Sequence, residues 1–144
     1  MSGIISVSEA ASIAFHTAFY LATNSKQLVR NQEMADELHV SQEHLAKIIQ
    51  RMARAGVIKT VRGPKGGCCL TEKGKAASLL QIYEAVEGPY QQLGCLLQQQ
   101  ICRDKCLLLG GLLQKMSREV YQQLKKTTLA DVAIAAKKSY KEVK

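Results

Sequence analysis

The fold of this chain is decided between residues 39 and 70, which read HVSQEHLAKIIQRMARAGVIKTVRGPKGGCCL. The first half repeats apolar residues at the spacing of one helix face, which indicates an amphipathic helix packed on a core. Ser41 stands where a helix N-cap is expected, and Gly56 stands where a helix ends. The apolar face consists of Leu45, Ile48, Ile49 and Met52.

The periodicity changes after Gly56. Residues 57–61 (VIKTV) are rich in β-branched side chains, residues 63–67 (GPKGG) have the composition of a turn, and residues 68–70 (CCL) can return as a second strand. The stretch therefore predicts a β-hairpin, or wing, directly after the helix.

Two more helices are expected before this stretch. Asn31 is placed to cap a short helix, and the tight segment 39–41 joins it to the helix that Ser41 caps. Two short helices joined so closely are typical of a helix-turn-helix. Further upstream, residues 8–22 carry apolar residues at helical spacing, with Ser8 in the capping position.

The chain after the hairpin is expected to be helical on both sides of a loop. Residues 76–87 have a helical period, and a Gly-Pro pair ends it. Residues 90–106 are poorly periodic. Residues 107–126 predict a long helix whose apolar residues have a heptad-like spacing suited to a partner helix, and Thr128 caps a last helix over residues 129–140. The predicted fold class is mainly α with a small β-hairpin.

The charge balance favours a polyanionic partner such as DNA or RNA. Twenty Lys and Arg residues against 12 Asp and Glu give a formal net charge of +8, which is high for 144 residues. The lysines from Lys125 onward are interpreted as a solvated helix face. The central stretch is different, because it coincides with the helix-turn-helix and contains no acidic residue. Its basic residues are Lys47, Arg51, Arg54, Lys59, Arg62 and Lys65.

Several protein classes are disfavoured. No apolar run approaches the roughly 20 residues of a membrane span, and no signal peptide is evident. We therefore expect a cytoplasmic protein that does not contact a membrane, in which structural disulfides are not expected. No Ser/His/Asp arrangement, phosphate loop or pair of carboxylates suggests catalysis. The chain is not expected to be an enzyme or to have a small-molecule substrate.

The start of the second helix of a helix-turn-helix reads base edges in the major groove. Gln42 can pair with adenine, Glu43 can accept from cytosine, and the neighbouring Ser41 and His44 can meet bases or phosphates. An ordinary polar helix start remains the alternative, because Ser followed by Gln and Glu also satisfies the capping rules. We expect phosphate contacts from Lys47 and Arg51, a DNA contact from Lys65, and insertion of Arg62 into a minor groove.

The hairpin string VRGPKGG at 61–67, the preceding VSQEHLAKIIQRMARAGVI and the late TLAD at 128–131 resemble the winged-helix regulator family of IscR and NsrR. The resemblance extends over residues 7 to 135. It implies a homodimer joined by the long helix, bound to a palindromic or semi-palindromic operator in double-stranded DNA. It also implies that Arg62 enters the minor groove and that Ser41 to Lys47 read the major groove.

Three of the five cysteines, Cys95, Cys102 and Cys106, stand where cluster-bearing members of that family have their ligands. Thiolates are soft, charged ligands that suit iron–sulfur clusters. The spacing C-x6-C-x3-C departs from the more even spacing common in the family. The resemblance implies a 2Fe-2S or 4Fe-4S cluster held by these three residues, and three free or buried thiols remain the alternative.

The fourth ligand is where the chain departs from the family. The family's histidine after the third cysteine is matched by Leu109, and its acidic residue on the first helix of the opposite subunit is matched by Ser12. Glu9 and His16 lie about one helical turn to either side of that position and could substitute. The nuclearity of the cluster therefore stays open.

The other two cysteines, Cys68 and Cys69, fall on the returning strand of the hairpin. We interpret them as small strand residues, with an oxidant-sensing vicinal pair as the alternative. The prediction is a homodimeric DNA-binding regulator, with a repressor favoured, controlled by an iron–sulfur cluster. Its rivals are the same fold responding through thiol oxidation or a protein partner, and a winged helix that binds a protein. Its segments are a DNA-binding domain (1–88), a cysteine-bearing sensor loop (89–106) and a region with the dimerisation and C-terminal helices (107–144).

Overall fold

The computed structural model describes residues 6–24, 26–96, 108, 109 and 111–142. Over these residues it is largely helical, with a two-stranded antiparallel sheet, which confirms the predicted fold class. The elements are α1 (Glu9–Thr23), α2 (Asn31–Leu38), α3 (Gln42–Arg54), β1 (Ile58–Val61), β2 (Gly67–Leu70), α4 (Glu72–Lys75), α5 (Leu79–Glu87), α6 (Leu112–Lys126) and α7 (Leu129–Glu142).

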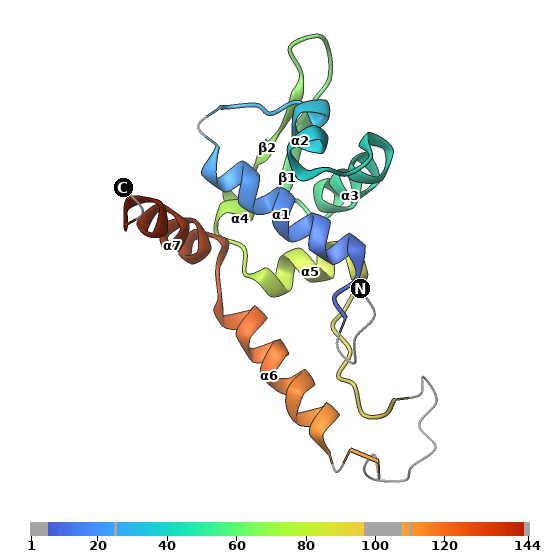
Figure 1. The fold of residues 1–144 in the computed structure, drawn as a ribbon. Coiled ribbons are helices and arrows are strands. Elements are labelled where there is room, and N and C mark those ends of the chain that lie inside the picture. The colour runs from blue at the N-terminus through green and yellow to red at the C-terminus, as the bar shows by residue number, and fades with distance from the viewer. Residues whose placement is uncertain (1–5, 25, 97–107, 110, 143–144) are drawn as a thin grey trace.

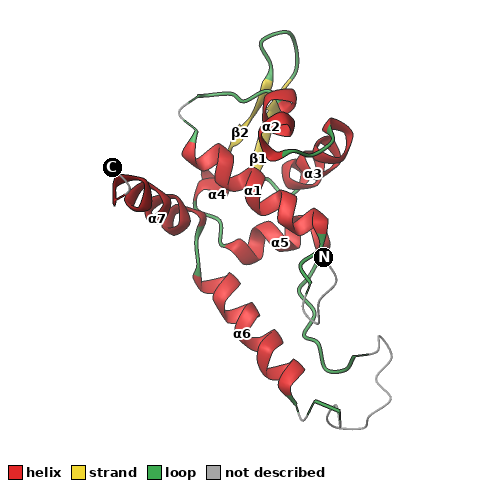
Figure 2. Ribbon diagram, viewed as in Figure 1, coloured by secondary structure: helices red, strands yellow, loops and turns green. Residues whose placement is uncertain are grey.

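The molecule has a body and a helical arm. The body contains the first five helices and the hairpin, α6 leads back to it from the far end of the arm, and α7 follows beside α1 (Figure 1). Figure 2 shows that the loop joining the two strands projects from an otherwise helical structure. No helix in the described part of the chain is long and apolar enough to cross a lipid bilayer.

Helix α1 lies at the centre of the body. Ser8 caps it as predicted, because its Oγ accepts a hydrogen bond from the Ala11 backbone N–H (3.1 Å). One face of the helix is buried against α3, α5 and α7. That face consists of Ala11, Ile13, Ala14, Thr17, Ala18 and Leu21.

Helices α2 and α3 form the predicted helix-turn-helix. The cap of α2 was predicted one residue too late: Arg30 is the N-cap, without a side-chain capping bond, and Asn31 is the first helical residue. Ser41 caps α3 as expected, its Oγ accepting from the His44 N–H at 3.1 Å. His39 ends α2 in the left-handed region (φ 54°), and Gly56, with φ 77°, follows α3 at the predicted stop.

The hairpin is the predicted wing. Its register runs from the pair Ile58↔Leu70 to the pair Val61↔Gly67. At its base, Val29 and Cys68 exchange two backbone hydrogen bonds of 3.0 and 2.8 Å. The segment before α2 therefore pairs with β2 and attaches the wing to the body.

Helix α5 begins at Leu79, three residues after the predicted start at 76. Ser78 forms a capping box with Gln81: Ser78 Oγ accepts from the Gln81 N–H (3.2 Å), and Gln81 Oε1 accepts from the Ser78 N–H (2.9 Å). This box starts the helix locally, so residues 76–78 stay outside it. Gly88 ends α5 as predicted, with φ 83°.

The predicted long helix is shorter than expected. Its expected start at 107 lies outside the described residues, and α6 itself begins at Leu112 after Gly111, which has φ 84°. Thr128 Oγ1 accepts from the Asp131 N–H (3.2 Å) at the start of α7, the predicted capping position. Two backbone bonds, Leu79 N–H to Thr127 O and Leu129 N–H to Ala77 O (both 2.9 Å), attach the α6–α7 corner to the body.

The core joins the helix-turn-helix to the rest of the body. It contains the predicted apolar face of α3 together with residues from α1, α2, the wing, α5 and α7. Complete burial of such side chains stabilises the fold by about 1.5–3 kcal/mol each. The largest fully buried apolar side chains are Met34, Leu45, Ile48, Ile49, Met52, Ile82 and Leu129.

Candidate nucleic-acid interface

The outer face of α3 is polar and exposed. Glu43, Lys47, Gln50 and Arg54 follow one another at helical spacing, opposite the buried side of the helix, and all four are exposed. Ser41 and Gln42 at the start of the helix are exposed as well. This face carries hydrogen-bonding groups in the positions from which a helix can reach base edges and phosphates.

Glu43 and Lys47 form an ion pair on this face. Lys47 Nζ lies 2.8 Å from Glu43 Oε1, and this hydrogen bond lowers the pKa of the Glu43 carboxyl. Both side chains are largely exposed, so the pair contributes little to stability. The Lys47 ammonium has three N–H donors, so it can keep this bond to Glu43 and still donate to another acceptor.

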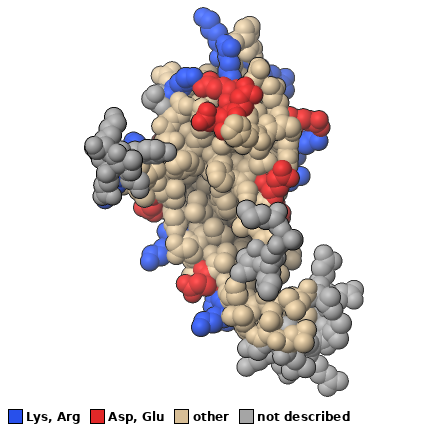
Figure 3. All heavy atoms as spheres, in the orientation of Figure 1, with Lys and Arg blue, Asp and Glu red and all other residues tan. Residues whose placement is uncertain are grey.

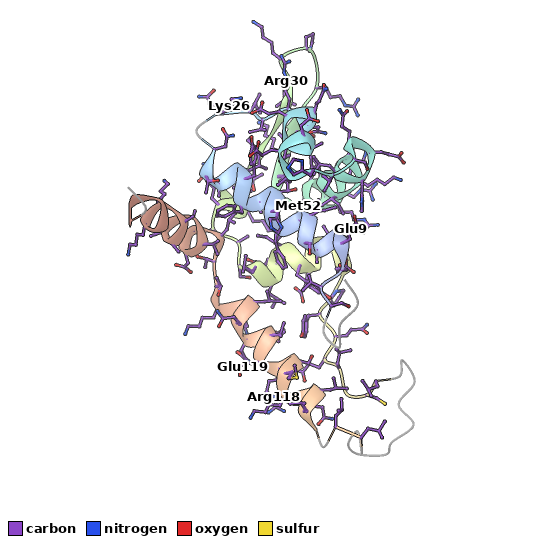
Figure 4. The ribbon with its side chains drawn as sticks, in the orientation of Figure 1. Glu9, Lys26, Arg30, Met52, Arg118 and Glu119 are labelled. Atoms are coloured by element: carbon purple, nitrogen blue, oxygen red, sulfur yellow. The ribbon has the colours of Figure 1, made fainter. Side chains whose placement is uncertain are left out.

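His44 and Arg51 lie on a different flank of α3 from the outer face. His44 Nδ1 is 3.8 Å from Glu9 Oε1, and Figure 4 shows Glu9 at the beginning of α1. Arg51 Nη1 donates to the Val86 carbonyl at the end of α5 (3.0 Å). His44 and Arg51 are two helical turns apart along α3. Around the helix axis, both lie about a quarter of a turn from the middle of the outer face. The structure thus brings them together with α1 and α5 rather than with Lys47.

The tip of the wing presents two cations. Arg62, Gly63, Pro64 and Lys65 are exposed, and Gly63 adopts φ 111°, which L side chains rarely adopt. The Gly66 N–H donates to the Gly63 carbonyl (2.9 Å) and closes the turn. Figure 3 shows Lys and Arg side chains where the wing projects, with acidic side chains just below them over α2.

Three residues near these surfaces were missed as site candidates. Gln50 and Arg54 share the outer face of α3, and helical periodicity from Glu43 could have found them. Arg30 Nη2 donates to the Pro64 carbonyl (3.1 Å) across 34 positions of sequence, a contact that no local pattern signals.

The segment that leads to the predicted cluster ligands is anchored to α6. The Tyr90 hydroxyl donates to the Ser117 carbonyl (2.9 Å), and the Leu93 N–H donates to Ser117 Oγ (3.0 Å). Ser117 is 4% exposed, and the Tyr90 ring lies between Tyr83 and Tyr121, with centroids 5.6 and 5.4 Å away. The first residues of the cysteine-bearing loop (89–106) are therefore held against α6 as far as Leu93.

Of the three predicted cluster ligands, the structure describes one. Cys95 is half-buried, two residues beyond the Leu93 anchor, and Cys102 and Cys106 lie outside the described residues. Within the described ranges, no group of three or more His, Cys, Asp and Glu side chains is arranged to hold a metal ion. The donor set suits iron chemically, because three cysteines can supply soft thiolates.

The possible fourth ligands Glu9 and His16 lie on α1, while Leu109, which has no ligand atom in its side chain, stands before α6 at the family's histidine position. His16 is exposed, and its Nδ1 lies 2.7 Å from the Ser12 carbonyl. Glu9 is directed toward His44, as described above. Leu109, half-buried, accepts at its carbonyl from the Leu112 N–H (2.8 Å). None of these contacts identifies a fourth ligand, and this assignment stays a prediction.

Cys68 and Cys69 point to opposite faces of β2, because side chains alternate along a strand. Cys68 is fully buried in the core, and burial raises the pKa of its thiol to about 11. A thiol in that state is protonated near neutral pH and is a poor nucleophile. The expected small strand residue is confirmed for Cys68, and the alternation does not favour a bond between the two sulfurs.

Known proteins share this sequence pattern and fold. Over 68 residues the chain is 40% identical to the HTH-type transcriptional regulator NsrR of Bacillus licheniformis, a match covering 46% of each chain. It is similar to CymR, the global cysteine regulator of B. subtilis (TM-score 0.75, 21% identity, 92% of this chain and 98% of that one), and to T. potens IscR (TM-score 0.71, 20% identity, 94% and 91%).

The match to a whole family covers most of the chain. Residues 7–135 match the Rrf2 family, described as "Iron-dependent Transcriptional regulator". This range includes the helix-turn-helix, the wing, the cysteine-bearing segment and the first half of α7. The structural likeness to CymR and IscR supports the same fold. The chain therefore belongs to the Rrf2 family of transcriptional regulators.

Proposed function

We propose that this regulator binds double-stranded DNA as a homodimer, with the outer face of α3 in the major groove and Arg62 of the wing in the adjacent minor groove. The observation that carries the proposal is the exposed polar face of α3 followed directly by a hairpin with a cationic tip. Helix-turn-helix proteins read base edges with the start of such a helix. A narrow minor groove attracts an inserted arginine.

The residues divide by role. Ser41, Gln42 and Glu43 at the start of α3 read base edges, while Lys47 and Lys65 contact phosphates. The predicted contacts of His44 and Arg51 with DNA stay predictions, because their present partners lie on α1 and α5. To contact DNA, His44 and Arg51 would either use donors that these partners leave available or release the partners.

Selection of binding sites from randomised duplexes tests this assignment. The Gln42→Ala/Glu43→Ala variant is expected to select a different consensus, since each lost bidentate contact removes about 1–3 kcal/mol of discrimination. Lys47→Ala is expected to keep the consensus, weaken all sequences alike and reduce the slope of log K against log salt. An unchanged consensus from the double variant would overturn the proposed base readers. Absence of duplex binding by the wild type would favour the protein-binding rival.

We further propose that Cys95, Cys102 and Cys106 hold an iron–sulfur cluster whose state controls the affinity for the operator. When bound, the cluster would supply chemistry that responds to iron, oxygen or nitric oxide at a site linked to the DNA-binding body. The description of the family as iron-dependent and the identity with NsrR support this proposal. The expected action is repression of transcription.

A second candidate is regulation through thiol oxidation, or through a protein partner, without a cluster. The likeness to CymR, described as a cysteine regulator, favours retaining it. Iron and acid-labile sulfide assays on anaerobically prepared protein separate the two candidates. Protein that binds no iron yet responds to oxidants in a DNA-binding assay would support the thiol mechanism.

The homodimer is proposed to form along α6. The first turns of this helix lie far from the body (Figure 1), and Leu112 and Val120 on it are 48% and 42% exposed. Met116 lies between them at a spacing of four residues and is half-buried. Apolar residues at this spacing on an exposed helix are covered when a second copy of the helix packs against them.

A further inference from the structure

The tip of the wing extends beyond its strand pairing. The register ends at Val61↔Gly67, and the residues between them are joined by the single turn bond from the Gly66 N–H to the Gly63 carbonyl. A two-stranded hairpin is marginally stable by itself. The position of Arg62 therefore depends on what the tip touches in the body.

The loop before α2 contacts the wing in two places, at the base of the hairpin and at its tip. Val29 is paired with Cys68 at the base, and the neighbouring Arg30 reaches the tip, where its Nη2 donates to the Pro64 carbonyl at 3.1 Å. Among the described residues, Arg30 is the side chain of the body that is hydrogen-bonded to the tip. Figure 4 shows Arg30 beside the hairpin.

Gly67 makes this close approach possible, and Gly66 allows the hairpin itself to turn tightly. A Cβ on Gly67 would lie 2.5 Å from the Val29 carbonyl oxygen, and a Cβ on Gly66 would lie 2.2 Å from the Val61 carbonyl oxygen. A side chain at position 67 would clash with the loop before α2, and one at position 66 would clash with the backbone of the hairpin itself. Arg30 and Asn31 border the resulting hollow of about 370 Å³, whose other walls come from the wing, Arg62 included.

The hydrogen bond of Arg30 bears on how Arg62 binds DNA. An arginine side chain enters a narrow minor groove most easily when its backbone is already held at the correct distance from the body of the protein. A tip without a brace would have to lose its freedom on binding, which weakens association. The hydrogen bond from Arg30 to the Pro64 carbonyl, two residues from Arg62, restricts the conformational freedom of the tip before DNA binds.

We propose that Arg30 is a positioning residue for the wing: its hydrogen bond to Pro64 sets the position from which Arg62 enters the minor groove. The inference rests on the proposed DNA binding and adds to it a residue outside the recognition helix and outside the hairpin. Arg30 would contribute to DNA binding only by positioning Arg62. Arg30 should therefore affect the preference for A·T-rich minor grooves as well as affinity.

The test is a double-mutant cycle with Arg30→Met and Arg62→Ala, measured by fluorescence anisotropy on the selected operator and on a copy whose wing-contacted steps are changed from A·T to G·C. Methionine keeps much of the length of arginine and removes the donor. Arg30→Met is expected to weaken operator binding roughly tenfold and to reduce discrimination between the two duplexes. In the Arg62→Ala background the same change should have little further effect.

Two controls separate positioning from charge and from folding. Arg30→Lys keeps a donor that can reach the Pro64 carbonyl and is expected to restore most of the discrimination. Lys26→Met removes one positive charge nearby, where Lys26 is paired with Glu33 (2.6 Å) rather than with the wing, and is expected to keep the discrimination. Thermal melting of each variant shows that the fold is retained.

The inference would be overturned if Arg30→Met and Arg62→Ala had additive effects on the free energy of binding and Arg30→Met reduced the slope of log K against log salt by about one phosphate contact. Arg30 would then be a direct phosphate ligand. Wild-type discrimination retained in Arg30→Met would also overturn it while leaving the proposed function intact. Absence of duplex binding by the wild type would instead overturn the proposed function, and the inference with it.

Discussion

At the scale of single residues, Arg62 is the side chain whose removal should change DNA recognition most clearly. Its side chain is exposed and lies outside the core, so truncation leaves no cavity there. Arg62→Ala is expected to weaken operator binding by about 1–3 kcal/mol, as for a charged hydrogen-bonding contact, and to reduce the preference for A·T-rich flanks. Anisotropy titrations with duplexes of different flanks measure both effects.

Lys65→Ala provides the matched control on the same tip. A lysine that contacts phosphate should weaken all duplexes alike and leave the flank preference intact. Equal flank preference in Arg62→Ala and in the wild type, with both proteins folded and dimeric, would contradict the minor-groove assignment.

A buried hydroxyl on α1 predicts a stabilising substitution. Thr17 is fully buried, and its Oγ1 has no hydrogen-bond partner among the described residues. Burial of an unpaired hydroxyl costs free energy, and valine has nearly the same shape without that cost. Thr17→Val is expected to raise the free energy of unfolding by about 1 kcal/mol in denaturant titrations.

The control lies on the same helix. Thr23 is exposed, and its Oγ1 donates to the Phe19 carbonyl (2.9 Å), so Thr23→Val should leave the stability nearly unchanged. A loss of stability in Thr17→Val would show that the hydroxyl is paired in solution.

At the scale of elements, α6 carries the prediction about assembly. Val120 is exposed on the side of the helix that also bears Leu112, so a charge there would be buried in the proposed dimer. Val120→Glu is expected to shift the protein from dimer to monomer in sedimentation equilibrium at micromolar concentration. Operator affinity should fall with it, because two half-sites are bound together.

Arg118→Glu is the control for charge on α6. Arg118 is exposed, and it lies on nearly the opposite side of the helix from Val120 because the two are two residues apart. The dimer should therefore persist. A monomeric wild type, or a dimeric Val120→Glu variant, would contradict the proposed interface.

At the scale of the whole molecule, hydrogen bonds connect the cysteine-bearing segment to α3. The Tyr90 N–H donates to Glu84 Oε1 on α5 (3.0 Å), and two residues later the Val86 carbonyl accepts from Arg51 on α3 (3.0 Å). A change in the segment beyond Leu93 thus has a contiguous route to α3. Two arrangements of this route with different affinities for DNA would make the protein a switch.

The corresponding prediction concerns the cluster. Anaerobically prepared protein is expected to be brown and to contain iron and acid-labile sulfide, and Cys95→Ala, Cys102→Ala or Cys106→Ala should each abolish the colour. Operator affinity should differ between the brown and bleached forms. Cys69→Ala is the matched control and should keep the colour, because Cys69 lies on β2. Iron retained in all three cysteine variants would contradict the assignment of ligands.

The sequence by itself determined the features whose causes are local. The caps at Ser8 and Ser41, the stop at Gly56 and the strand–turn–strand of the wing each depend on a few neighbouring residues, and the structure agrees with them. The start of α5 was also local, because Ser78 and Gln81 form a recognisable capping box, but a broader helical period obscured it. The family followed from the same local motifs.

The tertiary structure alone decided which polar residues face the body. A helical period divides α3 into an apolar and a polar side, yet the partners of His44 and Arg51 come from α1 and α5, whose approach depends on packing of the whole core. Arg30 is the clearest case. Its bond to Pro64 exists because Val29 pairs with β2 and brings together residues 34 positions apart, and no pattern along the chain encodes that distance.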